Sequence, residues 1–453
     1  MMLTVWCKPF TRPRIGKNVQ EGVGPHICTE KSILTRRVTA GKSLTYWKPV
    51  FRTANVKSFP PIALSRIPVE LQLLVCCIRN PGVMSDENRA CIRQLVSEQD
   101  PDWHKIISLA ERHRVLPFLH DGLRSAKLDD VPSEPWQRIH KKYLSNAVIN
   151  AALVEEIVRL QELCRAHDID VLPFKGPILA RALYGDITYR TCDDLDFLVR
   201  HRDIDRARRV FLEDGFVPHI DMTESEQSRH RSAGWEYMLR HPDMGYLVEL
   251  DTCTGPRFQE FELPSDEIFE EPVAVHIDNE VVYTVNPEVL LLMLCVHGPR
   301  HDWDRLTWVT DILAIWRAFP DMSFERISLR AGELGAKRML LLGHALAGAV
   351  AGSELSGAIS EAISHDSKIP GLVEQCIRSW TRESKVSHSR MRFRLAVRER
   401  LRDRVLYVLR IACTPSYGDW KAVRLPRKLY ALYYVIRPFR LALKALAKLL
   451  QRR

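Results

Sequence analysis

Two carboxylates one residue apart, Asp194 and Asp196, stand in the middle of an apolar stretch of the chain. If 194–199 is a strand, side-chain alternation points both carboxylates to one face and leaves Leu195 and Phe197 to face a core. Two anions at this range repel each other unless a cation lies nearby. Magnesium is commonly held by one or two carboxylates together with substrate phosphates. The pair therefore predicts a site for Mg²⁺ or Mn²⁺.

A second acidic segment, YLVELD at 246–251, reads as another strand in which Glu249 and Asp251 share a face. Acidic residues within a strand are disfavoured unless they have a partner. The segment is therefore either an exposed edge strand or a neighbour of strand 194–199 that supplies a third metal ligand, either Glu249 or Asp251. Three carboxylates on adjacent strands can hold two metal ions about 4 Å apart, which activates an attacking oxygen and stabilises a leaving pyrophosphate.

Lys175 and Gly176 form a predicted turn between a strand and a helix. Such a turn exposes backbone N–H groups and a helix N-terminus, which suit a phosphate. Pro177 is equally well read as the first residue of that helix. Arg190, four residues before Asp194, either pairs with a triphosphate or offsets the nearby acids.

His297 and His301 have the spacing that binds zinc on a continuous helix, but Gly298 and Pro299 lie between them. Proline disfavours an uninterrupted helix. We therefore expect a structural role, in which both histidines pack with neighbouring tryptophans against the α/β unit; these are Trp303 and Trp308. The sequence contains no GxSxG motif, no P-loop and no Rossmann glycine series.

The periodicity of apolar residues predicts the elements that must position these residues. The α/β unit is predicted from strands at 169–174, 194–199, 237–241 and 246–252 with helices at 178–184 and 204–214. Helical patterns precede it at 68–80, 86–98, 102–114, 134–148 and 147–167. Others follow it at 287–298, 301–319, 323–334, 336–351 and 355–364. This order predicts an α+β fold with a mixed β-sheet core, flanking helices and a helical C-terminal region.

The net charge of +10 over 453 residues is concentrated at the two ends of the chain. Residues 1–60 carry 11 basic and 2 acidic side chains, and residues 381–453 carry 20 basic and 4 acidic ones. The body between them is therefore acidic. An acidic body with basic ends is typical of an enzyme with electrostatic tails rather than of a domain that coats nucleic acid. No specific nucleic-acid partner is predicted.

The eleven cysteines are scattered, with no CxxC or similar ligand spacing, so we expect reduced thiols and no zinc module. The N-terminus has no apolar core of signal-peptide length. The longest apolar run, near 339–350, is too short to span a bilayer. We therefore expect a cytoplasmic protein.

Basic side chains recur every fourth residue at the C-terminus, at Arg440, Lys444, Lys448 and Arg452. Apolar side chains line another face, at Phe439, Leu443, Leu446 and Leu450. This amphipathic pattern predicts either a helix that lies on an anionic membrane surface, through 425–453, or a closing helix packed on the acidic body.

The run LPFKGPILARALYGDITYRTCDDLDFLV resembles the signature of the bacterial uncharacterised nucleotidyltransferase family, within the DNA polymerase β-like nucleotidyltransferase superfamily. That family typically has Lys-Gly, a Tyr, an Arg, then Asp-x-Asp and an apolar strand. The corresponding residues here are Lys175, Gly176, Tyr184, Arg190, Asp194 and Asp196. Similar flanks at 102–119 and 297–312 extend the resemblance over roughly 68–365.

The resemblance implies a five-stranded mixed sheet and metal-dependent transfer of a nucleotidyl group. It makes Asp194 and Asp196 metal ligands and Glu249 the third catalytic carboxylate. In two places the chain departs from the pattern. A Ser that commonly follows the turn Gly is Pro177 here, and the usual carboxylate-x-His is Glu249-x-Asp251.

We therefore predict a nucleotidyltransferase that moves an NMP from an NTP onto an acceptor hydroxyl, with Lys175, Gly176 and Arg190 binding substrate. The alternatives are a catalytically silent nucleotide-binding protein and a membrane-surface assembly protein of the same fold. The predicted regions are a disordered basic extension (1–62), a helical region (63–167), the nucleotidyltransferase-like core (168–285), a second helical region (286–380) and a basic amphipathic tail (381–453).

Overall fold

The computed structural model describes residues 67–127, 131–220, 222, 226, 236–252, 261, 263–352, 357–381, 388–423 and 425–450. All of them belong to one compact unit, Trp47–Arg453. The extension predicted to be disordered, 1–62, lies outside the described residues.

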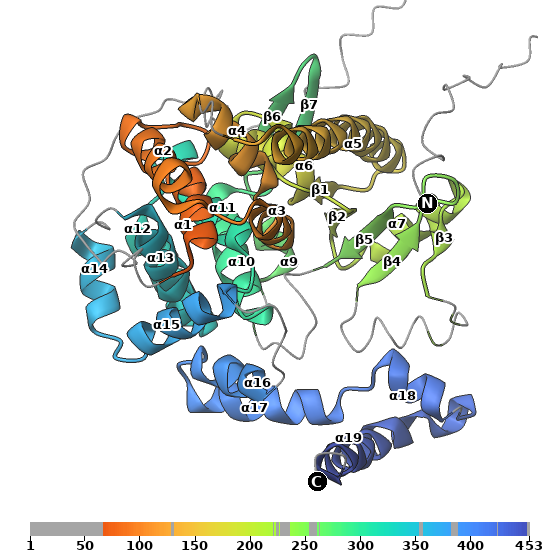
Figure 1. Cartoon of the computed structure of the whole chain (residues 1–453). Helices are drawn as coiled ribbons and strands as arrows, with labels where there is room; N and C mark the ends of the chain where they lie inside the picture. Colours follow the sequence, from red (N-terminus) through yellow and green to blue (C-terminus); the bar gives the residue numbers. More distant parts are fainter. Residues whose placement is uncertain are drawn as a thin grey trace, which may run out of the picture. The chain divides into compact units, whose positions relative to one another are not determined.

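Helices precede the sheet, as the periodicity predicts (Figure 1). They are α1 (Val69–Ile78), α2 (Asp86–Gln99), α3 (Trp103–Arg112), α4 (Leu116–Ala126) and α5 (Ser133–Ala166). The segments expected at 134–148 and 147–167 are a single helix of 34 residues. The Asp102 carboxylate caps α3 by accepting a hydrogen bond from the Lys105 N–H at 3.1 Å.

Cys76 of α1 and Cys91 of α2 form a disulfide, with Cα atoms 6.5 Å apart. The expectation of reduced thiols is therefore wrong for this pair. The two helices pack against each other, which brings together two cysteines that are fifteen residues apart. Their spacing along the sequence carries no sign of this pairing.

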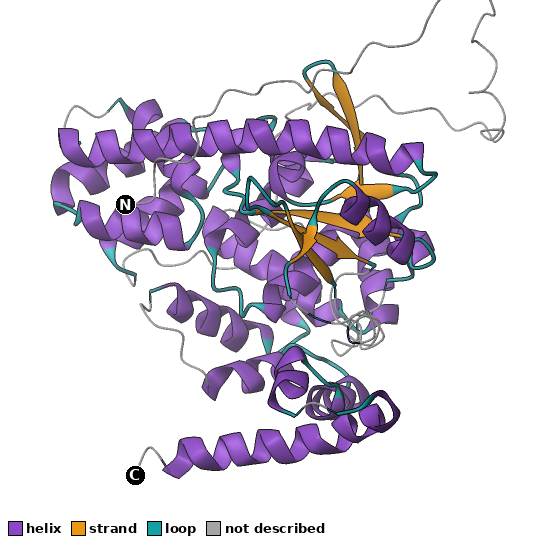
Figure 2. Ribbon diagram, turned by 90° about the vertical axis from the view of Figure 1, so that its right-hand side faces the viewer, coloured by secondary structure: helices purple, strands orange, loops and turns teal. Residues whose placement is uncertain are grey.

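The sheet has the strand order β1-β2-β5-β4-β3. Its strands are β1 (Val171–Pro173), β2 (Asp194–Val199), β3 (Val217–Pro218), β4 (Tyr237–Arg240) and β5 (Leu247–Asp251). The central strands β2 and β5 are parallel and the other pairs are antiparallel. Between β1 and β2 lie helix α6 (Gly176–Tyr184) and the 3-10 turn η2 (Ile187–Tyr189), and α7 (Ile204–Glu213) follows β2. This mixed sheet among helices (Figure 2) confirms the predicted α+β class.

The two faces of β2 meet different surroundings because its side chains alternate. Leu195, Phe197 and Val199 are buried in one apolar cluster with residues of β5, α5 and α7. The Phe197 ring lies edge-on to Phe211 of α7, with centroids 6.2 Å apart. Asp194 and Asp196 therefore point to the opposite face, which helices α5 and α7 leave open.

After the sheet come α9 (Ser265–Ile268) and a hairpin of β6 (Val273–Ile277) and β7 (Glu280–Thr284). The following helices are α10 (Pro287–Arg300), α11 (Leu306–Ala318), α12 (Phe324–Leu334), α13 (Lys337–Ala351), α14 (Gly357–Ser364) and α15 (Ile369–Trp380). The Asn286 side chain caps α10 by accepting a hydrogen bond from the Glu288 N–H at 2.9 Å. The long apolar run lies in α13, which is buried against α10, α11, α12 and α15. Within the described part of the chain, no helix has the length and apolar character needed to cross a bilayer.

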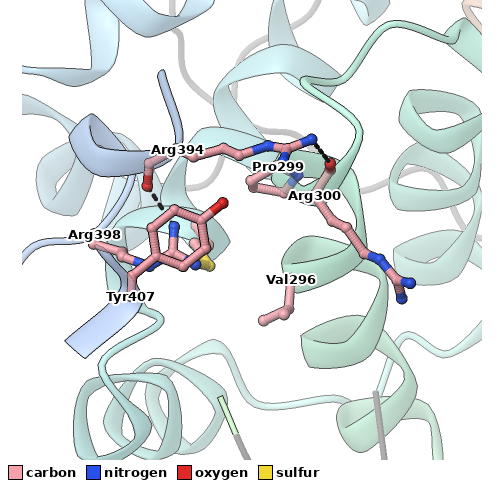
Figure 3. Close-up of a pocket in the computed structure, with 7 residues that line it drawn as sticks. Val296, Pro299, Arg300, Arg394, Arg398 and Tyr407 are labelled. Carbon is pink, nitrogen blue, oxygen red and sulfur yellow. Dashed lines mark hydrogen bonds between the residues drawn. The ribbon is translucent and has the colours of Figure 1, made fainter. Parts of the chain in front are cut away.

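The C-terminal helices are α16 (His388–Ala396), α17 (Leu401–Cys413), α18 (Tyr417–Ala422), the 3-10 turn η4 (Arg427–Leu432) and α19 (Tyr433–Leu450). Helix α16 is anchored to the end of α10, because Arg394 Nη2 donates a hydrogen bond to the Arg300 carbonyl at 2.7 Å (Figure 3). The Arg398 guanidinium lies 3.6 Å from the centre of the Tyr407 ring. These contacts connect the basic tail to a helix that also lines the site described next.

Candidate active site

The acidic residues of β2 and β5 lie on one face of the sheet. Parallel register pairs Asp196 directly with Glu249, and Leu198 with Asp251. Since register partners in neighbouring strands point to the same side, the carboxylates adjoin. They open into a cavity of about 250 Å³. Its polar and aromatic lining consists of Arg114, Phe174, Lys175, Arg190, Thr191, Cys192, Asp194, Asp196, Glu236, Glu249, Asp251, His297, Arg300, His301, Asp304, Arg305 and Trp308.

Lys175 and Gly176 lie at the start of α6, beside the carboxylates. Lys175 is the N-cap residue in an extended conformation, and its Nζ is 2.6 Å from Asp196 Oδ1. Gly176 has φ +62°, a region that L side chains rarely adopt, so the turn requires glycine here. The predicted strand–turn–helix is thus present, and the N-terminus of α6 faces the cavity.

Burial and mutual repulsion shift the titration of these groups. Burial raises the pKa of the Glu249 carboxyl to about 7, and the charge of Asp196 adds to the shift. The pKa of Asp194 is raised for the same two reasons, burial first and Asp196 second. Burial lowers the pKa of Lys175, but the attraction of Asp196 outweighs it and the pKa is raised overall. The site therefore holds more negative charge than one lysine can offset.

The geometry distinguishes the two candidates for the third carboxylate. Glu249 is the register partner of Asp196, whereas Asp251 lies deeper in the sheet. Burial, followed by the charge of Glu236, raises the pKa of Asp251 well above its ordinary value. Burial thus favours the uncharged form of the Asp251 carboxyl. This arrangement favours Glu249 as the partner of Asp194 and Asp196.

Arg190 lines the cavity, but its guanidinium is ion-paired with the fully buried Asp311 of α11. The Tyr184 hydroxyl donates to the same carboxylate at 2.7 Å. The sequence left two roles open for Arg190, pairing with a triphosphate or offsetting nearby acids. In the structure Arg190 offsets the charge of an acid, Asp311, which is far away in sequence. Asn150 of α5 helps to fix the loop, because its amide donates to the Arg190 carbonyl at 2.7 Å.

The helix α10 runs through Pro299 and ends at Arg300, so the expectation that proline interrupts it is wrong. Because proline has no N–H to donate to the Cys295 carbonyl, the last turn of α10 has one backbone hydrogen bond fewer than a regular helix. Trp303 is fully buried and structural, as expected. His297, His301 and Trp308 instead line the cavity, with ring centroids 4.6 to 5.4 Å apart.

These two histidines are neutral at pH 7. Burial lowers the pKa of His301 to about 3, with a further contribution from the cation of Arg300. Burial, followed by the charge of Lys175, lowers the pKa of His297 well below its ordinary value. They therefore offer uncharged hydrogen-bonding groups opposite the acidic strands.

Sequence analysis missed the cationic part of the lining, Arg114, Arg300 and Arg305. Arg114 Nη1 donates to the Thr191 carbonyl at 3.3 Å, which ties the α3–α4 turn to the loop before β2. The Arg305 guanidinium lies 5.7 Å from the centre of the Trp308 ring. The available signal was that Arg114 falls in the upstream flank of the family resemblance, and Arg300 and Arg305 in the downstream flank. Nothing local distinguishes them from surface arginines.

The donor set suits magnesium or manganese in its chemistry. All candidate ligands are carboxylates, and Mg²⁺ needs only one or two of them when substrate phosphates supply the rest. Burial and the repulsion of neighbouring carboxylates raise the pKa values of Asp194 and Glu249, and a bound cation would offset this repulsion. Among the described residues, no three His, Cys, Asp or Glu side chains are placed so that they could bind one metal ion together. The Asp196 carboxylate is instead ion-paired with Lys175. The residues present therefore fit an ion that arrives with phosphate.

The mixed sheet and its two adjacent acidic strands agree with the five-stranded mixed sheet and the carboxylates that the family resemblance implies. Residues 99–352 match the family model described as Uncharacterised nucleotidyltransferase, and because this is more than half of the chain, the chain belongs to that family. The resemblance drawn from the motif is thereby confirmed, and the protein is a nucleotidyltransferase by family.

No curated protein matches the chain. Among solved structures, it is similar to the antibiotic-resistance factor ANT(2'')-Ia, whose solution structure was described as revealing substrate-regulated conformation dynamics. The identity is 11%, the match covers 44% of this chain and 97% of that chain, and the TM-score is 0.30.

Proposed function

We propose that the protein transfers a nucleoside monophosphate from an NTP to an acceptor hydroxyl and releases pyrophosphate, in a reaction that depends on Mg²⁺ or Mn²⁺. The observation that carries this proposal is the register of Asp196 and Glu249 on adjacent parallel strands, with Asp194 on the same face of a cavity of about 250 Å³. Nucleotidyl transfer of some kind follows from the family.

Asp194 and Asp196 are the proposed ligands of the ion. When bound with the NTP, the ion would offset phosphate charge and stabilise the departing pyrophosphate. Glu249 is proposed to complete the site and to accept the proton of the acceptor hydroxyl, which requires the ionised form of its carboxyl group. Positioning of the two substrates supplies most of the acceleration in phosphoryl transfers.

Lys175 and Gly176 are the proposed phosphate contacts. The Lys175 ammonium would attract phosphate oxygens, and the positive φ of Gly176 lets the backbone turn at the N-terminus of α6. Pro177 is the second residue of that helix and lacks an N–H group, so one donor is missing there. Arg190 lines the cavity and stays a predicted substrate contact in addition to its ion pair with Asp311.

The direct test is transfer of label from each α-³²P-labelled NTP to the components of a cell extract, with Mg²⁺ or Mn²⁺. We expect labelled product with the wild type and a loss of at least about a hundredfold for Asp194→Asn and Asp196→Asn. Asp170→Asn, at an exposed position away from the cavity, is the matched control and should retain transfer. Absence of transfer with every NTP, or unchanged transfer in Asp194→Asn, would count against the proposal.

A second candidate is a nucleotide-binding protein without turnover. It is favoured by the missing donor at Pro177 and by the ion pair that ties Lys175 to Asp196. Calorimetry that detects NTP binding to a protein inactive in the transfer assay would support this candidate.

We also propose that the protein works in the cytoplasm, on an anionic membrane surface that it contacts through residues 425–453. The support is charge, because this segment has eight Lys or Arg residues and no Asp or Glu. If the protein is instead an assembly protein without transfer activity, we propose that it acts at this membrane in the assembly of surface glycans.

A further inference from the structure

Exposed apolar side chains gather on the C-terminal helices. More than half of the large apolar side chains that are exposed in the described residues lie between Leu401 and Leu443. On α17 they are Leu401, Val405, Val408 and Leu409. At 100° per residue these four occupy an arc of about 100°, which is one continuous face of the helix. This face was not predicted from the sequence.

Helix α19 carries a second face of the same kind. Val435, Phe439 and Leu443 recur at every fourth residue and are exposed, Phe439 by 68% and Leu443 by 66%. Side chains of this size are normally covered when they form a continuous stripe. Two contacting helices thus each present an uncovered apolar face.

Internal contacts already engage the arginines nearest to these faces. Asp419 of α18 is fully buried and binds both Arg437, at 2.5 Å, and Arg440, at 2.6 Å. Arg437 Nε also donates to the Ile411 carbonyl of α17 at 2.9 Å. Arg440, which was expected to belong to the basic stripe at the C-terminus, therefore has a structural role. The side chains of Lys448 and Arg452 lie outside the described part of the chain. These bonds fix α19 to α17 and leave the apolar faces uncovered.

We propose that α17 is a second membrane-contacting helix, and that its apolar face inserts with that of α19 into the surface of an anionic lipid bilayer. Residues 388–453 contain 18 Lys or Arg and 3 Asp or Glu, which complements anionic headgroups. Apolar stripes within so basic a region are typical of helices that lie in a membrane interface. The inference rests on the proposed membrane contact of 425–453 and extends it to α17; it does not depend on catalysis.

Co-sedimentation of the full chain with vesicles of phosphatidylcholine and phosphatidylglycerol (3:1) tests the inference. The test variant is Leu401→Asp/Leu409→Asp on α17, and Phe439→Asp/Leu443→Asp serves as the corresponding variant on α19. Leu329→Asp is the matched control, because Leu329 is 69% exposed on α12, outside the proposed surface. All positions are exposed, so folding should persist, and circular dichroism checks this. We expect each double variant to bind at least about tenfold more weakly and the control to bind like the wild type.

The possible results separate this inference from the proposal on which it rests. Loss of binding in the α19 variant alone would overturn the role of α17 and leave the contact through 425–453 intact. A wild type that does not bind these vesicles would overturn both. If the α17 variant changed only the sedimentation-equilibrium mass and not vesicle binding, a second copy of the chain would cover this face, and the inference would be wrong.

Discussion

Glu249 changes its charge near neutral pH, because burial and the neighbouring Asp196 raise its pKa to about 7. Its unfolded-state pKa is about 4.3. Between these values the folded protein binds more protons than the unfolded chain, so this group makes the fold less stable as pH rises. A glutamine at this position cannot ionise and would remove that effect.

We therefore expect the stability advantage of Glu249→Gln over the wild type to grow by on the order of 1–3 kcal/mol between about pH 4.5 and 8. Urea denaturation in metal-free buffer at several pH values measures it. Glu280→Gln, at an exposed position of β7, is the control and should show no such trend. If the stability difference between Glu249→Gln and the wild type did not change with pH, the raised pKa of Glu249 would be contradicted.

Arg190 and Asp311 form a buried ion pair behind the cavity, and removing one partner leaves the other charge without compensation. We expect Asp311→Asn to lower the free energy of unfolding by about 3 kcal/mol. Glu288→Gln, which breaks the more exposed pair with Arg326, should cost less than about 1 kcal/mol. Chemical denaturation of both variants checks the difference, and equal losses would argue against a buried role for Asp311.

At the scale of elements, the end of α10 positions His297, Arg300 and His301, and this end depends on close packing. A Cβ added at Gly298 would lie 2.2 Å from the Trp303 ring. Trp303 is itself held by a hydrogen bond from its backbone N–H to the Gly298 carbonyl at 2.9 Å. Only glycine therefore allows the helix and the indole to approach this closely.

We expect Gly298→Ala to lower the free energy of unfolding by about 1–3 kcal/mol and to weaken NTP binding, because the cavity wall must shift. Gly332→Ala is the matched control, since Gly332 lies inside α12 with no atom within 4 Å of an added Cβ. That control should be neutral or slightly stabilising. Thermal denaturation measures the stability and calorimetry measures NTP binding. If Gly298→Ala changed neither, the Trp303 ring would move to make room for the added methyl group, and the prediction would be wrong.

At the scale of the whole molecule, the basic tail is attached to the catalytic body by specific contacts. Arg394 of α16 donates to the carbonyl of Arg300, whose side chain lines the cavity. Arg390 of the same helix lies 3.3 Å from Asp302. The tail is thus joined to the body through α16, while α17 and α19 keep exposed apolar faces.

The charge of the tail implies that membrane binding depends on salt. We expect binding to anionic vesicles to fall at least about tenfold between roughly 0.05 and 0.5 M NaCl, because screening weakens the attraction between Lys or Arg and lipid headgroups. Co-sedimentation over a salt series measures it, with pure phosphatidylcholine vesicles as the uncharged control. Binding that was equal on both kinds of vesicle would leave no role for the basic residues.

The sequence by itself determined the acidic half of the site. Strand alternation is a local property, so the common face of Asp194 and Asp196 and the turn at Lys175 and Gly176 followed from spacing alone. The spacing could not distinguish Glu249 from Asp251 as the third carboxylate, because this choice depends on the register between β2 and β5.

Only the tertiary structure decided the other half. Arg114 of the α3–α4 turn is far in sequence from His297 of α10 and from Arg305, which caps α11, and their meeting depends on how these helices pack. The ion-pair partner of Arg190 is 121 residues away in sequence. The apolar face of α17 is recognisable only in the structure, because it depends on which helices pack against α17. Such features depend on long-range contacts, which residue types and local spacing do not encode.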